Sequence, residues 1–252
     1  MNRNLITDGI ILKNTKIGEI HKGISIFSEI KGIINAVAHG AAKSKGKLAG
    51  YTDPFSLITA YIYFNPVKKS YTIKDISIID GFENIRSDLK KIYVSSFWAE
   101  VILRSFGGGD DHRAFYYLLR DALIAINNET EKAIDMVLIQ FLWKYLILSG
   151  FLPDIHKCGS CGRPLDEKDE AFFHGNELLF LCRGCSLKGL SGLSPGARKY
   201  LEFTKRLDFR KAIKIGLDSI SRSSIKAILI RLTQLIIEVP LKSLDSGKGV
   251  FY

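Results

Sequence analysis

The sequence has no uninterrupted apolar run long enough to cross a membrane. Its most apolar stretch, residues 136–152, is interrupted by Gln140, Lys144 and Tyr145 and is short for a transmembrane helix. A helix that is apolar on nearly every side is typical of the buried centre of a helical domain. The first eight residues also lack the apolar core of a secretory signal peptide. We therefore expect a soluble, cytoplasmic protein with no membrane partner.

A recognisable catalytic constellation is also missing: there are no paired carboxylates, no metal-hydrolase motif and no cysteine–histidine pair. Two short motifs imitate enzyme signatures. Residues 192–196 spell G-x-S-x-G, but Pro195 follows the serine and has no backbone N–H for an oxyanion hole. Residues 40–46 resemble a phosphate-binding loop, but five residues separate the glycines where four are required, and Leu48 replaces the magnesium-binding hydroxyl residue. We expect neither an enzyme nor a small-molecule substrate.

Acidic residues are fewer than basic ones, 26 against 36, and the formal net charge is +10. The excess is uneven. Residues 1–80 hold 11 basic and 6 acidic residues, residues 81–185 hold 12 and 15, and residues 186–252 hold 13 and 5. Two basic ends around an acidic middle indicate a polyanionic partner, of which nucleic acid is the most plausible, although solubility alone is the alternative.

Cysteine is scarce, and all of it falls in one segment. The four cysteines form two C-x-x-C pairs with 20 residues between them: Cys158, Cys161, Cys182 and Cys185. This spacing is typical of a four-thiolate zinc site, and four protein ligands leave no position for a substrate, so we predict one structural Zn²⁺. Two disulfides or four unrelated thiols are the alternatives, and His156 or His174 is a substitute ligand if one cysteine does not bind.

The N-terminal part reads as a small β-barrel. Five short β-like runs precede any helix, at residues 6–13, 24–30, 33–39, 57–64 and 71–79. Lys31-Gly32 is a turn signal between the second run and the third. This order predicts an OB-fold in residues 1–81.

Candidate DNA contacts come from aromatic and basic side chains. In the fourth run Tyr61 and Tyr63 share the outward face and are suited to stacking on bases, or alternatively to packing against a neighbouring domain. The glycine-rich connection at residues 39–50 offers lysines to phosphates, unless it is merely a solvated loop. The predicted contacts are Lys13, Lys43, Lys45, Lys47, Tyr61, Tyr63, Arg198, Lys199, Lys205 and Arg206.

The remainder reads as helices, at residues 84–104, 112–126, 131–149 and 221–239, with a further start at Ser194-Pro195. We predict an α+β protein: a five-stranded OB-fold barrel, then an all-helical domain at residues 82–153 and 190–245, with a four-cysteine zinc knob inserted at residues 154–189.

The order of these parts resembles the RecO family of bacterial recombination mediators. The resemblance includes V-A-H-G-A at 37–41, L-S-P-G at 193–196 and P-L-K-S-L-D at 240–245. It extends over nearly the whole chain, at residues 8–12, 18–19, 26–28, 31–32, 48–50, 54–55, 84–89, 99–100 and 162–165. The paired cysteines are similar to those of the family's zinc-bearing members.

The resemblance implies binding of single- and double-stranded DNA, annealing of complementary strands, and loading of RecA onto SSB-coated strands with RecR and, in many bacteria, RecF. It also implies binding of the acidic, apolar SSB tail, for which Arg104, Arg113 and Arg120 are the candidate cations, unless they pair with nearby aspartates. It implies a cytoplasmic, nucleoid-associated protein. An RNA- or ribosome-associated zinc-ribbon protein is one alternative. A zinc-stabilised nuclease is another, although no carboxylate cluster is present to hold Mg²⁺.

Overall fold

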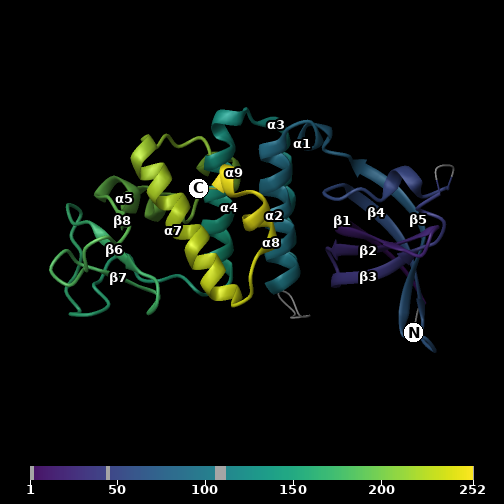
Figure 1. The fold of residues 1–252 in the computed structure, drawn as a ribbon, viewed down its shortest axis with the longest axis horizontal. Helices are drawn as coiled ribbons and strands as arrows, with labels where there is room; N and C mark the ends of the chain where they lie inside the picture. The colour runs from purple at the N-terminus through teal and green to yellow at the C-terminus, as the bar shows by residue number, and fades with distance from the viewer. Residues whose placement is uncertain (1–2, 44–45, 106–111, 252) are drawn as a thin grey trace. The chain divides into compact units, whose positions relative to one another are not determined.

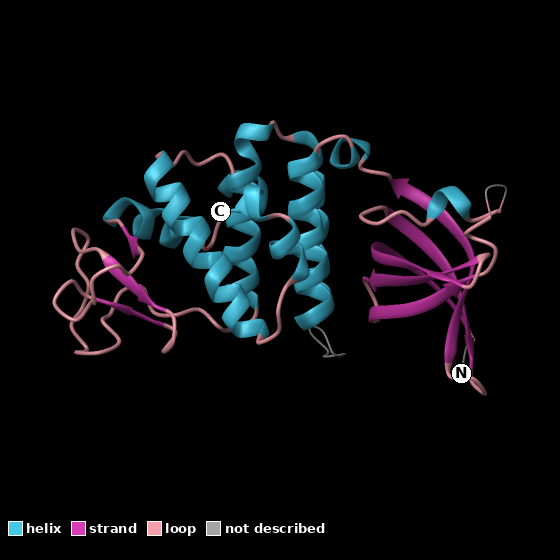
Figure 2. Ribbon diagram, viewed as in Figure 1, coloured by secondary structure: helices cyan, strands magenta, loops and turns pink. Residues whose placement is uncertain are grey.

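The structure, a computed structural model, describes residues 3–43, 46–105 and 112–251 (Figure 1). The chain divides into two compact units, residues 1–128 and 129–252. Strands dominate the start of the first unit, whereas helices dominate the second (Figure 2). Within the described ranges, no helix is both long and apolar enough to cross a membrane.

Five strands close into a barrel in the order β1-β2-β3-β5-β4. Their bounds are β1 Asn4–Ile17, β2 His21–Ser28, β3 Gly32–Ala38, β4 Leu57–Asn65 and β5 Ser70–Asp80. Neighbouring strands are antiparallel except β3 and β5, which close the barrel through a short parallel pairing of Ala36 with Tyr71 and Val37 with Thr72. A closed barrel leaves no long unpaired edge.

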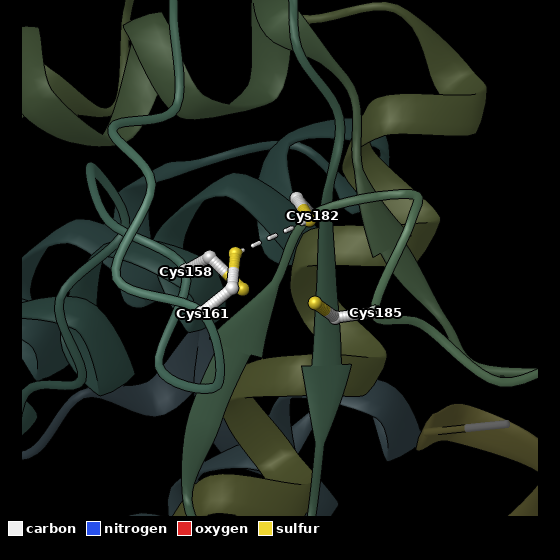
Figure 3. Close-up of side chains that lie close together, drawn as sticks. All are labelled: Cys158, Cys161, Cys182 and Cys185. Carbon is white, nitrogen blue, oxygen red and sulfur yellow. Dashed lines mark hydrogen bonds between the residues drawn. The ribbon is translucent and has the colours of Figure 1, made fainter.

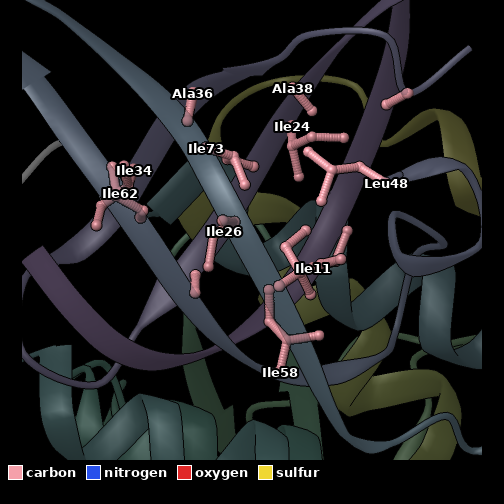
Figure 4. Close-up of a cluster of buried hydrophobic side chains, with 13 residues drawn as sticks. Ile11, Ile24, Ile26, Ile34, Ala36, Ala38, Leu48, Ile58, Ile62 and Ile73 are labelled. Atoms are coloured by element: carbon pink, nitrogen blue, oxygen red, sulfur yellow. The ribbon is translucent and has the colours of Figure 1, made fainter. Parts of the chain in front are cut away.

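The barrel interior is filled by aliphatic side chains from every strand (Figure 4). On β4 the residues Ile58, Ala60 and Ile62 point inward, because successive side chains of a strand alternate between its two faces. Tyr61 and Tyr63 therefore lie on the outer face. The predicted Lys31-Gly32 turn joins β2 to β3, and Gly32 adopts a φ of +69° that favours glycine. A 3₁₀ turn, η1 Ala49–Tyr51, lies between β3 and β4.

Three helices complete the first unit: α1 Glu83–Arg86, α2 Leu89–Ser105 and α3 His112–Asn128. Helix α3 packs on the β2–β3 hairpin, where the rings of Phe27 and Tyr116 lie 6.0 Å apart in an edge-to-face arrangement. The hairpin residue Glu29 accepts hydrogen bonds from the Tyr117 hydroxyl at 2.5 Å through its carboxylate and lies 3.1 Å from His112 Nε2 through its carbonyl oxygen. The first helices and the barrel thus share one unit.

The second unit is built around a buried helix. Its helical elements are η2 Glu131–Ala133, α4 Ile134–Leu148, α5 Pro195–Thr204, α6 Phe209–Ala212, α7 Ser219–Ile237, α8 Lys242–Ser246 and α9 Lys248–Phe251. Most side chains of α4 are buried, as its apolar sequence predicts. Ser194 caps α5 by accepting from the Ala197 N–H, with Pro195 in the first position, which confirms the predicted helix start.

Polar side chains of α4 hold α5. Gln140 donates to the Tyr200 hydroxyl at 2.8 Å, and the indole N–H of Trp143 donates to the Leu201 carbonyl at 3.0 Å. Lys144 donates to the Leu207 carbonyl at 2.6 Å, and burial lowers the pKa of its ammonium group. The bonds from Gln140 and Trp143 hold α5 beside the apolar centre, and the bond from Lys144 holds the turn that follows α5.

A small three-stranded sheet, in the order β7-β6-β8, lies between α4 and α5 in the sequence. Its strands are β6 Ala171–His174, β7 Leu179–Leu181 and β8 Gly192–Leu193, and the four cysteines cluster beside it. The predicted fold class, a five-stranded barrel followed by helices with a four-cysteine insertion, is confirmed. The three predicted domain ranges stay a prediction. The division into two compact units does not show which parts of the chain fold independently.

Candidate metal centre and nucleic-acid interface

Two tight turns bring the four cysteines together, and their side chains point toward a common centre (Figure 3). In the first turn the Cys158 N–H donates to the Arg163 carbonyl and the Gly162 N–H to the Cys158 carbonyl. In the second, the Cys185 N–H donates to the Cys182 carbonyl. The Gly159 N–H donates to the Phe180 carbonyl at 2.8 Å and so connects the first turn to β7, which precedes the second.

The sulfur positions fit a tetrahedral ion. The four sulfur atoms lie within 4.8 Å of one another, and all four thiols are free. Four zinc–sulfur bonds of about 2.3 Å would hold the sulfurs about 3.8 Å apart. The Sγ atoms of Cys161 and Cys182 lie 3.9 Å apart. This arrangement is suited to one metal ion held by thiolates alone.

The electrostatics of the cluster favour a cation. Burial raises the pKa of the Cys158 thiol, but backbone N–H groups of Cys161, Cys182 and Ser160 outweigh it and lower the value to about 6. Sharing of protons with Cys161 and Cys182 raises the pKa of Cys185 to about 12. Neighbouring thiols therefore cannot all ionise at neutral pH without a positive charge between them. A bound divalent ion would supply that charge.

The substitute histidine ligands lie apart from this group. His156 Nε2 lies 3.1 Å from a carboxylate oxygen of Glu202, and His174 Nδ1 lies 3.9 Å from Glu177. Among the described histidines, cysteines and carboxylates, the group close enough to share one ion consists of the four cysteines. The structure thus gathers the predicted cysteines and leaves both histidines to other contacts.

Arg198, predicted as a DNA contact, has a different position. Its side chain is only 5% exposed, and its guanidinium donates at 2.7–2.9 Å to the carbonyls of Ile155, Leu165, Asp166 and Asp169. These carbonyls come from the segment around the first cysteine pair. Arg198 is therefore buried and uses four of its five N–H groups to join helix α5 to that segment, so we correct its assignment. The sequence around Arg198 gives no signal for this role, because the four carbonyl partners lie 29 to 43 residues away.

The outer face of the barrel presents the predicted aromatic residues. Tyr61 is 39% exposed and pairs across the sheet with Ile6 of β1 and Asp75 of β5. Lys47 donates to the Asp75 carboxylate at 2.8 Å, which lowers the pKa of that carboxyl and holds the basic connection beside Tyr61. Sequence reasoning missed both Ile6 and Asp75, which only the strand register reveals.

The other predicted contacts lie at several places. Lys74 Nζ stands 5.2 Å from the ring centroid of Tyr63, a cation–π contact on the same barrel face. Lys45 lies outside the described residues. The remaining basic candidates are exposed: Lys13, Lys43, Lys199, Lys205 and Arg206. Their exposure is compatible with phosphate contact but does not test it.

The arginines predicted for the SSB tail all have acidic neighbours. Arg104 lies 3.9 Å from Glu100, and Arg113 lies 3.9 Å from Glu29. Arg120 pairs with Asp121 at 2.9 Å and covers the Tyr117 ring at 4.6 Å. The alternative of ordinary ion pairing therefore applies to each, although the exposed pairs of Arg104 and Arg113 are weak.

Two family models match the chain in succession. Residues 1–82 match the model described as Recombination protein O N terminal, and residues 86–245 match Recombination protein O C terminal. The chain is 25% identical to the DNA repair protein RecO of Caldanaerobacter subterraneus subsp. tengcongensis over 245 residues, which cover 96% of this chain and 97% of the relative. It is 32% identical to the DNA repair protein RecO of Oceanobacillus iheyensis over 179 residues, covering 71% and 67% of the two chains. With matched models over both halves, a five-stranded barrel and a helical second unit, the chain belongs to the RecO family of recombination and DNA repair proteins.

Proposed function

We propose that this protein binds single- and double-stranded DNA without sequence preference and anneals complementary strands during recombinational repair. The observation that carries the proposal is the outer barrel face, where the exposed ring of Tyr61 lies beside Tyr63, Lys74 and Lys47. Aromatic rings stack on bases of any sequence, and lysines neutralise phosphates. The relatives named as DNA repair proteins support the same function.

Annealing requires no covalent chemistry by the protein. Two complementary strands repel each other through their phosphates, and a protein of formal net charge +10 reduces that repulsion while bases pair. In the cell the protein acts with RecR, and with RecF where present, to load RecA onto strands coated by SSB. This places it in the cytoplasm at the nucleoid. The RNA-binding alternative is tested by comparing affinities for DNA and RNA of equal length.

The four cysteines hold one Zn²⁺ in this proposal. All four ligands come from the protein, so the ion has no free position for substrate and acts as a structural centre. Thiolate ligands and close tetrahedral spacing favour zinc over harder cations such as magnesium. Zinc determination on protein purified without chelators tests the identity of the metal.

We assign the SSB tail to the first unit, with Arg113 and Arg120 as the cations for its carboxylates. The two residues are seven apart on α3 and so lie on one helical face. Titration with a fluorescent tail peptide tests this assignment. If the double variant Arg113→Ala/Arg120→Ala binds the tail peptide with unchanged affinity, the binding site for the tail lies elsewhere.

The barrel surface is tested by replacing one ring. Tyr61→Leu removes the π-face and should weaken single-stranded DNA binding by roughly tenfold, in line with one lost base stack. Tyr61→Phe is the matched control, because it keeps the ring and should retain most of the affinity. Fluorescence anisotropy measures the affinities. If the Leu variant, the Phe variant and the unsubstituted protein bind equally well, Tyr61 does not contact DNA.

A further inference from the structure

The second unit contains a groove of about 520 Å³ between helix α5 and the segment 156–168. Its walls include Leu165 and Pro195, and the ring of Phe203 stands at its side with 58% of its surface exposed. Concave surfaces lined by apolar side chains together with a few polar groups are typical of ligand-binding sites. The groove is therefore a candidate site for a flat, apolar group.

Basic residues stand on both sides of the ring. Lys199, Phe203 and Arg206 follow at steps of four and three residues, and this spacing places them on one face of a helix. Arg206 follows Lys205, which caps α5 with helical backbone angles, so the helical direction continues to it. Arg206 lies just beyond the end of α5, and a helical rise of about 1.5 Å per residue separates the Cα atoms of Lys199 and Arg206 by about 10 Å along the axis, one on each side of Phe203. Lys168 adds a third cation from the opposite wall.

The basic residues that line the groove, Lys168, Arg198 and Lys199, outnumber its acidic ones, Glu167 and Glu202. Glu202 is bonded to His156 at 3.1 Å, and that bond is the first cause of the lowered pKa of its carboxyl, followed by the nearby Lys205 and Arg206. Glu167 also lines the groove. Arg198 also lines the groove, but its guanidinium donates four hydrogen bonds to backbone carbonyls. The groove thus combines an accessible aromatic ring with an excess of positive charge.

We propose that this groove binds single-stranded DNA, with one unstacked base against the Phe203 ring and flanking phosphates on Lys199 and Arg206. The inference rests on the proposed function and extends it with a second contact, in the helical unit. A ring between two cations matches the alternation of base and phosphate along a single strand. In a duplex the bases are stacked on each other and offer no free face, so the site discriminates in favour of single strands.

The experiment measures oligonucleotide binding by Phe203→Leu against a matched control. Phe151 is a second phenylalanine of the same unit, it is 57% exposed, and it lies outside the groove, so Phe151→Leu controls for loss of an exposed ring. We expect Phe203→Leu to bind a single-stranded oligonucleotide about tenfold more weakly, with unchanged affinity for duplex and an unchanged salt dependence. Lys199→Ala and Arg206→Ala should each flatten the salt dependence by about 0.7 in the slope of log K against log salt.

A single 2-aminopurine in the oligonucleotide reports on stacking directly. Its fluorescence should be quenched by the unsubstituted protein and by Phe151→Leu, and less so by Phe203→Leu. If the protein binds single strands but Phe203→Leu does so equally well, no base lies on the ring, and the groove serves another ligand such as an apolar peptide. If the unsubstituted protein binds no DNA, the proposed function itself fails and this inference fails with it.

Discussion

Arg198 connects the four-cysteine segment to the helical core through four hydrogen bonds to carbonyl oxygens. Burial lowers the pKa of its guanidinium, since a charged group loses solvation there, but the group remains protonated at neutral pH. A planar guanidinium can reach several acceptors at once, which an ammonium group cannot do in the same geometry. We therefore regard Arg198 as a structural residue of the second unit.

Replacing Arg198 with methionine should lower the free energy of unfolding of this unit by roughly 2–4 kcal/mol, because buried carbonyls lose their donors. Urea unfolding followed by circular dichroism is the measurement. The adjacent Lys199 is exposed, so Lys199→Met serves as the control and should change stability little. Equal losses in the two variants would show that the four bonds contribute nothing specific.

Cys182 is the buried cysteine of the second pair. Cys182→Ser should abolish tight zinc binding and lower stability by several kcal/mol, because the free energy of metal binding is part of the free energy of folding. Protons compete with the metal for thiolates, so zinc should also dissociate as the pH falls. Elemental analysis and unfolding with and without chelator measure both effects. A metal-free protein from chelator-free purification, or a Cys158–Cys161 disulfide, would contradict the account.

Among the connecting elements, the loop between β3 and β4 carries Lys43, Lys45 and Lys47. Replacing all three with alanine should weaken DNA binding and flatten its salt dependence, because each neutralised phosphate contributes to the slope. The effect of Lys47 alone should be the smallest, since it already pairs with Asp75. Anisotropy titrations between 50 and 200 mM salt measure the slope. If the triple variant keeps the original slope, the C-terminal basic residues become the better candidates.

Helices, strands, turns and caps that are set by residues close together in the sequence could be predicted. The five strands, the Lys31-Gly32 turn and the Ser194 cap follow from local patterns, and the cysteine cluster follows from spacing. Contacts between distant segments could not. The burial of Arg198, the register that sets Tyr61 between Ile6 and Asp75, and the packing of α3 on the barrel all depend on tertiary structure. Sequence patterns give no signal for them.

For the molecule as a whole, the two surfaces proposed to bind DNA differ in kind. The barrel presents rings and lysines on a sheet surface, whereas the second unit presents the exposed residues of α5 beside a groove. The four-cysteine cluster also lies in the second unit, and Arg198 bonds to carbonyls of the segment around its first pair.

Annealing of SSB-coated oligonucleotides measures whether the protein brings complementary strands together. Fluorophores on the two strands report pairing by energy transfer, and a denaturing gel of the same samples reports strand length. We expect added protein to make annealing faster and the annealing rate to fall as the salt concentration rises. We expect the strands to keep their length. Annealing no faster than without the protein, or shortened strands in the presence of Mg²⁺, would contradict the proposed function.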